Sequence, residues 1–88
     1  MHESSLMASL MKKIEILAEE NGASRVTGIR VWLGALSHFS KEHFQEHFDV
    51  ASKGSCAEGA VLTMELSDDE RNPRAQDVIL EEIEVEDD

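Results

Sequence analysis

A stripe of apolar residues near the start of the chain recurs every three or four positions and predicts its first element. The stripe runs through Leu6, Leu10, Ile14 and Leu17. This spacing places the apolar side chains on one side of an α-helix, and charged residues occupy the other side. Asn21-Gly22 suits the left-handed cap that ends many helices. We therefore predict a helix over residues 5–21, with Ser4 or Ser5 able to cap its start.

Three later stretches show the apolar pattern of strands. Residues 25–33, 61–66 and 77–86 are rich in β-branched and other apolar residues, largely alternating with polar or charged ones. In the last stretch the apolar phase shifts between Leu80 and Ile83, which indicates a β-bulge. We predict a strand for each of the three stretches.

A second helix is predicted between the first two strands. Ser40 fits the N-cap position of a helix that ends near residue 53. Phe39 and Phe44 have the spacing of a hydrophobic staple, in which residues on either side of the cap pack together. The buried stripe of this helix is expected to comprise Phe44, Phe48 and Ala51.

The order helix, strand, helix, strand, strand indicates a single α+β domain over residues 1–88. The simplest packing places both amphipathic helices on one face of a three-stranded mixed sheet. Strands 25–33 and 61–66 flank a helix, so a right-handed parallel crossover is expected. Strands 61–66 and 77–86 are joined by the polar loop 67–76 and are predicted to pair antiparallel.

The acidic composition restricts the partners of the chain. Its 88 residues carry a formal net charge of −11, which repels nucleic acid and anionic membrane surfaces and favours a cationic partner or a metal ion. No apolar run approaches the ~20 residues that span a bilayer, and the start lacks the features of a secretory signal. The single cysteine, Cys56, fits a reducing compartment. We expect a cytoplasmic protein.

The first three residues, Met1-His2-Glu3, contain a candidate metal site. The α-amine, the amide nitrogen of His2 and its imidazole Nδ1 can close two chelate rings on one ion. This gives three nitrogen donors and leaves a fourth position open. Tetragonal nitrogen donation suits Ni(II) or Cu(II) better than Mg²⁺ or Ca²⁺, which prefer oxygen.

The ordered set of short motifs along the chain resembles a known family. These motifs are Met1-His2-Glu3-x-Ser5-Leu6, Arg25-Val26, Leu33-Gly34-Ala35-Leu36-Ser37, Phe48-Asp49-Val50, Ala57-Glu58-Gly59-Ala60 and Ile83-Glu84-Val85-Glu86. Together they cover nearly the whole chain and resemble the HypA/HybF family of nickel metallochaperones, which serve the maturation of nickel–iron hydrogenase and urease.

The resemblance implies a function and a site. It implies a nickel-binding maturation factor, rather than an enzyme, that helps to deliver nickel to an enzyme precursor together with a companion GTPase. It places Ni(II) on the Met1 amine, the His2 amide and the His2 imidazole. The amide or carboxylate of Glu3 would be the fourth donor.

One departure from the family pattern affects the implied metal content. Members of the family carry a zinc domain with two Cys-x-x-Cys pairs before the last strand, a strong signal for tetrahedral zinc. Here the loop 67–76 contains no cysteine, and Cys56 lies outside it. The chain thus looks like the nickel-binding domain alone, with no structural zinc. This departure leaves open a metal-independent interaction module, in which the acidic sheet and the Trp32 surface bind a partner or a second copy.

The remaining candidate residues have less distinctive interpretations. His43 and His47, four residues apart on the second predicted helix, could clamp one metal ion. Because no carboxylate at matching spacing completes the set, we favour boundary histidines with one nitrogen in water. His38 could join them only if its loop folds back. Cys56 is expected to be a small loop or core residue, and no nucleophile, phosphate loop or cofactor motif indicates an enzyme.

Overall fold

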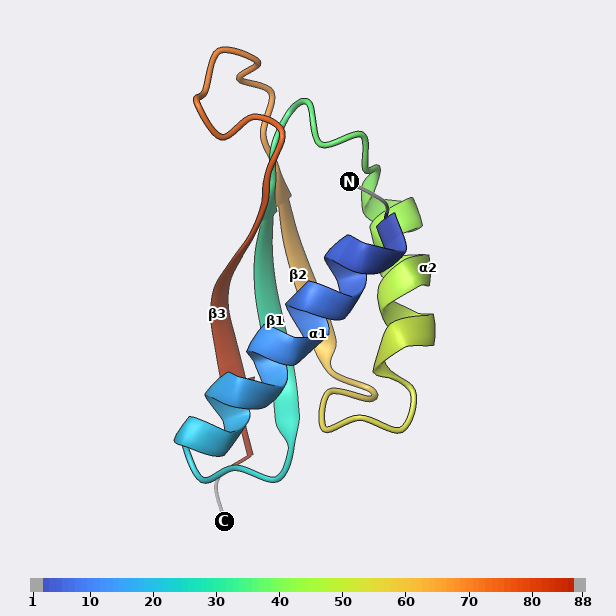
Figure 1. Ribbon diagram of the computed structural model, residues 1–88, viewed down its shortest axis with the longest axis vertical. Helices are drawn as coiled ribbons and strands as arrows, with labels where there is room; N and C mark the ends of the chain where they lie inside the picture. The colour runs from blue at the N-terminus through green and yellow to red at the C-terminus, as the bar shows by residue number, and fades with distance from the viewer. Residues whose placement is uncertain (1–2, 87–88) are drawn as a thin grey trace.

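Helices and strands alternate along the chain in the predicted order. The computed structural model describes the backbone of residues 3–86 and the side chains of residues 5–86. Within these residues the elements are α1 (Glu3–Glu20), β1 (Val26–Leu33), α2 (Lys41–Ser52), β2 (Val61–Leu66) and β3 (Val78–Val85). Both helices cover the same face of the sheet, as Figure 1 shows. The predicted α+β architecture, with order αβαββ, is confirmed.

The sheet is centred on β1. In the part of the chain that the structure describes, its strand order is β2-β1-β3, with β1 parallel to β2 and antiparallel to β3. The parallel crossover from β1 through α2 to β2 is therefore confirmed. The predicted antiparallel pairing of residues 61–66 with residues 77–86 is wrong, because the chain passes across the end of β1 before it forms β3.

The placement of the two helices gives a physical reason for this strand order. α1 packs against β3, whereas α2 packs against β2. With β3 on the far side of β1, α1 has its own part of the sheet to cover, and Figure 1 shows its C-terminal end lying across β1 and β3. A β2–β3 hairpin would have left one helix without that surface. Hairpins also favour loops of about 2–5 residues, and the segment between these strands is longer.

The bulge predicted in the last strand is present. Arg30 pairs with Glu82 and Val31 pairs with Leu80, so Glu81 is the extra residue on β3. The extra residue changes which side chains face the helices. It lets Leu80 and Ile83 both pack against the core although they are an odd number of residues apart.

The first helix begins two residues earlier than predicted and ends at Glu20, one residue before the predicted end. It starts at Glu3, so Ser4 and Ser5 lie inside the helix and do not cap it. No glycine or proline precedes Leu6, so no helix-breaking residue opposes this extension. At the other end Gly22 has a φ of 64°. The amide of Gly22 donates to the carbonyl of Glu19 (3.0 Å) and that of Ala23 donates to Ala18 (2.9 Å), which is the hydrogen-bond pattern of a Schellman cap.

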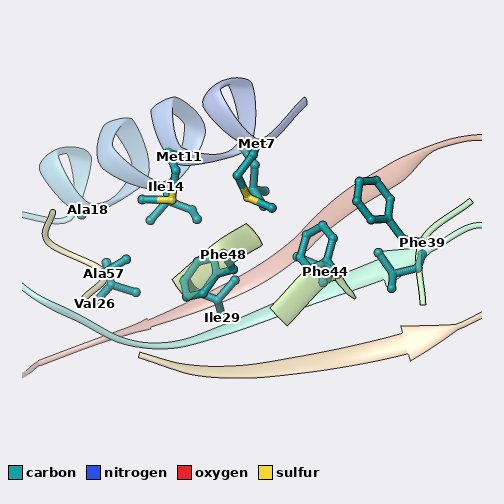
Figure 2. Close-up of a cluster of buried hydrophobic side chains, with 13 residues drawn as sticks. Met7, Met11, Ile14, Ala18, Val26, Ile29, Phe39, Phe44, Phe48 and Ala57 are labelled. Atoms are coloured by element: carbon teal, nitrogen blue, oxygen red, sulfur yellow. The ribbon is translucent and has the colours of Figure 1, made fainter. Parts of the chain in front are cut away.

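The core lies between the helices and the inner face of β1 (Figure 2). Its largest fully buried side chains are Phe44, Phe48, Ile14, Leu33, Val26 and Val31. Truncating a buried phenylalanine to alanine typically costs about 3–5 kcal/mol, against a total stability of about 5–15 kcal/mol for a natural domain. The predicted third member of the α2 stripe, Ala51, is exposed. Ser52 takes the inward position because it lies one four-residue step after Phe48.

The segment between β2 and β3 is fixed to the end of β1. The amide of Ser67 donates to the carbonyl of Leu33 (2.9 Å), and the amide of Gly34 donates to the carbonyl of Asp77 (2.9 Å). A Cβ atom added to Gly34 would overlap with the Ala75 carbonyl group and lie 2.9 Å from the carbonyl oxygen of Arg74. Gly34 is therefore required by close backbone contact, since its φ is not positive.

We predict that Gly34→Ala lowers the free energy of unfolding by about 1–3 kcal/mol, because backbone atoms rather than a flexible side chain oppose the added methyl group. Urea denaturation followed by circular dichroism measures the change. Gly28→Ala is the matched control, because the atoms nearest to its new Cβ would lie 3.4 Å away, at ordinary contact distance. Equal stability of the two variants would contradict this account of Gly34.

Candidate metal centre

The predicted nickel ligands lie at the start of the chain. Met1 and His2 lie outside the described residues, and Glu3 is described only as the first backbone position of α1. The first turns of α1 (blue in Figure 1) lie beside α2, and the two helices are in contact. The first described turns of α1 therefore lie near the N-terminal part of α2.

The N-terminus of α2 is held by the two interactions predicted from sequence. The Ser40 hydroxyl accepts a hydrogen bond from the amide of His43 at 3.1 Å, with the Ser40 backbone extended at φ −86° and ψ 160°. The rings of Phe39 and Phe44 pack edge to face with centroids 5.3 Å apart. The N-cap and the hydrophobic staple are both confirmed, and together they fix the direction in which α2 leaves its loop.

α2 brings two imidazole rings together. The Nε2 atoms of His43 and His47 lie 3.1 Å apart, within hydrogen-bond distance, and the ring centroids are 4.7 Å apart. The buried ring of Phe39 lies beside both, with centroid distances of 6.1 Å to His43 and 6.4 Å to His47. This packing limits the rotamers that the two histidines can adopt.

The exposure of the pair agrees with the predicted boundary histidines. The short distance between the two Nε2 atoms also places both rings within reach of one ion. His43 is exposed and His47 is half-buried. His38 is exposed in the preceding loop, at a φ of 67°, an uncommon conformation for a non-glycine residue. Among the described side chains, those of residues 5–86, no three His, Cys, Asp or Glu side chains gather to hold a metal. The structure thus does not bring His38 to the pair as a third ligand.

A groove between the two helices adjoins the histidine pair. It has a volume of about 830 Å³ and lies between α1 and α2. Its lining residues are Met7, Ala8, Met11, Lys12, Glu15, Glu46, His47, Val50 and Ala51. The side chain of Val50 is 73% exposed. The floor is therefore apolar, while charged side chains of both signs and one imidazole border it.

Sequence reasoning did not predict this groove. Ala51 was assigned to the core, and Val50 appeared only within a family motif. The available signal was the pair of small residues, Ala8 on α1 and Ala51 on α2, at positions that bulky side chains would otherwise fill. These two small residues indicate a hollow between the helices only once the relative placement of α1 and α2 is known.

Two other candidate residues, Cys56 and Trp32, are half-buried. Cys56 is half-buried and packs against the core, and its carbonyl oxygen accepts a hydrogen bond from the amide of Val26 at 2.9 Å. This agrees with the predicted loop or core role. Trp32, expected to be exposed unless both faces of the sheet were covered, is half-buried. Neither helix in the described part of the chain is long and apolar enough to cross a bilayer.

A family model described as "Hydrogenase/urease nickel incorporation, metallochaperone, hypA" matches residues 1–72 of the chain. Among curated proteins, the hydrogenase maturation factor HypA of Archaeoglobus fulgidus is 41% identical over 66 residues, which cover 75% of this chain and 60% of that protein. The hydrogenase maturation factor HybF of Salmonella typhimurium is 40% identical over 62 residues, covering 70% and 55%. The chain thus spans little more than half the length of these relatives.

Solved structures show the same fold. The solution structure of the Ni metallochaperone HypA from Helicobacter pylori superposes with a TM-score of 0.80, covering 97% of both chains at 18% identity. A second solution structure, of a HypA protein, gives a TM-score of 0.74 at 20% identity, covering 96% of this chain and 95% of the other. At these identities the likeness establishes the arrangement of helices and strands.

We predict that Ser40→Ala lowers the free energy of unfolding by about 1 kcal/mol, because the first turn of α2 loses its side-chain acceptor. Ser40→Asp is the matched control, since a carboxylate at the N-cap accepts the same hydrogen bond and should retain the stability. Thermal or urea unfolding measures both variants. An alanine variant as stable as the aspartate variant would show that the cap contributes nothing.

Proposed function

The chain belongs to the hydrogenase/urease nickel incorporation family of HypA metallochaperones, and on this premise we propose that it is a nickel-binding maturation factor. In this proposal it helps to deliver nickel to a nickel enzyme such as a nickel–iron hydrogenase. Its partners are the precursor of that enzyme and a companion GTPase, and the protein carries nickel as cargo rather than catalysing a reaction. The family match that begins at residue 1 and includes Met1-His2-Glu3 is the observation that carries the proposal.

The proposed nickel site consists of the Met1 amine, the His2 amide nitrogen and the His2 imidazole, with Glu3 as a possible fourth donor through its amide or carboxylate. The start of α1 at Glu3 supports this assignment. The first four amide groups of any helix have no partner within the helix. A metal ion can therefore displace the proton of such an amide nitrogen without breaking a helical hydrogen bond. Nitrogen donors in a tetragonal arrangement suit Ni(II).

The rest of α1 holds the site to the folded domain. Four residues of α1 are buried in the core, each with at most 7% of its surface exposed: Met7, Leu10, Met11 and Ile14. A metal-binding segment that directly precedes such an anchored helix loses less conformational freedom on binding than one on a loose tail. This favours nickel binding by the chain even without a further zinc domain.

We also propose that residues 1–88 act as one nickel-binding domain without structural zinc. Thiolates are the usual ligands of a closed zinc site, and the sequence has one cysteine, Cys56. The family match ends at residue 72, inside the loop where the resemblance places the zinc domain of other members. In that loop residues 68–71 are exposed.

An alternative function is a metal-independent interaction module derived from the same family. The apolar floor of the interhelical groove, with Val50 73% exposed, favours this candidate. Binding of a nickel-enzyme precursor that persists in the presence of chelator and in a His2→Ala variant would support it over nickel delivery. The same experiment separates the two functions, because nickel delivery requires His2.

We predict that His2→Ala abolishes Ni(II) binding of about one equivalent, because it removes the imidazole that closes the second chelate ring. Isothermal titration calorimetry on the untagged chain measures the loss. His38→Asn is the control, since it removes an exposed imidazole at a positive φ that asparagine tolerates. A His2→Ala chain that takes up Ni(II) with the same stoichiometry and affinity as the parent chain would refute the proposed site.

Acetylation of the α-amine tests the second donor. The acetyl group removes the amine as a ligand while leaving every side chain in place. We predict that Ni(II) affinity falls by tenfold or more, on the order of the loss of one arm of a chelate. The far-ultraviolet circular dichroism of the two forms should be the same. An unchanged affinity would mean that the amine does not bind nickel.

A further inference from the structure

The histidine pair on α2 has the geometry of a bidentate ligand. We propose that the Nε2 atoms of His43 and His47 form a second binding site for a borderline divalent cation of the zinc, nickel and copper class. The proposal concerns these two side chains, and its test is designed to be independent of the donors proposed on Met1, His2 and Glu3. Neutral imidazole is a suitable ligand for all three cations.

The separation of the two nitrogen atoms carries the proposal. A metal bound to two imidazoles lies about 2.0–2.1 Å from each nitrogen. With the nitrogens 3.1 Å apart, the angle at the metal would be about 98°. This value lies between the 90° angle of a square or octahedral site and the 109° angle of a tetrahedral site. A small rotation of the two rings therefore suffices to turn both lone pairs toward one ion.

The surroundings hold the pair in this arrangement before an ion binds. α2 is anchored by the buried rings of Phe44 and Phe48 and capped by Ser40. The ring of Phe39, drawn near the start of α2 in Figure 2, is 9% exposed and packs against both imidazoles. Since the two ligands are already neighbours, the loss of side-chain freedom on binding is reduced.

The charge and exposure of the site suit a cation that exchanges. Beside the pair, α2 carries Glu42, Glu46 and Asp49 against one cation, Lys41, and the chain as a whole is strongly acidic. His43 faces solvent and His47 borders the groove, so water can complete the coordination. The side chains that the structure describes, of residues 5–86, include no group of three such ligands, so the proposed site relies on the pair itself rather than on the four protein ligands of a closed structural site.

The alternative interpretation is a hydrogen bond between two surface histidines, in which one Nε2 donates and the other accepts. In that case a cation gains nothing from having both rings. In the proposed site the cation replaces the shared proton and contacts both nitrogens at once. The two interpretations differ in whether the loss of one ring removes the binding contributed by the other.

The experiment titrates the full chain with Zn(II) and follows the imidazole proton resonances of His43 and His47 by NMR. We expect both sets of resonances to shift together and to reach saturation at about one equivalent. His43→Gln and His47→Gln should each weaken binding by roughly tenfold to a hundredfold, and the double variant should be little weaker than either. Additive, small losses in the single variants would overturn the proposal.

Two controls complete the design. His38→Asn, which removes an exposed imidazole outside the pair, should leave the Zn(II)-dependent shifts unchanged. In a His2→Ala chain the shifts at His43 and His47 should persist, even if Ni(II) binding at the chain start is lost. If His2→Ala abolishes them, the second site is refuted while the nickel proposal stands. Zn(II) should also raise the unfolding temperature of the parent chain but not of the double variant.

Discussion

The burial of Phe44 and Phe48 against β1 and α1 is the interaction on which the rest of the structure depends. α2 has 12 residues, a length at which an isolated helix is marginal in water. Its helical state therefore comes from packing rather than from its own propensity. Figure 2 shows Phe48 between the side chains of α1 and Ile29 of β1, so the same rings hold the two layers together. The histidine pair, the interhelical groove and the surroundings of the α1 start all exist only while α2 is packed.

Both proposed metal sites use residues at or near the start of a helix. One uses the residues that lead into α1, and the other uses the first two turns of α2, which lie beside the start of α1 in Figure 1. In the proposed function a cargo ion must be bound and also released, so nitrogen and oxygen donors suit transfer better than a closed set of four thiolates. The strong negative charge of the chain attracts cations without fixing where they bind.

Local patterns predicted the elements well because each depends on a few neighbouring residues. The spacing of apolar residues in α1, the Ser40 cap, the Phe39–Phe44 staple and the bulge at Glu81 were all readable in this way. The pairing of the strands was not, because β2 and β3 are adjacent in sequence but are placed by which helix covers which side of β1. The sequence predicts Ala51 at the inward position that Ser52 occupies. An apolar stripe advances by either three or four residues, and only packing decides between them.

The candidate sites show the same limit. The spacing of His43 and His47 indicated that they share one side of a helix, but the 3.1 Å between their nitrogens depends on rotamers set by Phe39.

The attachment of residues 67–77 to β1 leaves room for added chain. Both ends of this segment are hydrogen-bonded to the sheet, while residues 68–71 project into solvent. Extra chain inserted between Asp69 and Asn72 would break local hydrogen bonds of this turn, such as that from the Asn72 amide to the Asp69 carbonyl at 3.3 Å. The further cost is a loop-closure entropy that grows slowly with length, so the domain can accept an added module at this turn without disturbing its core.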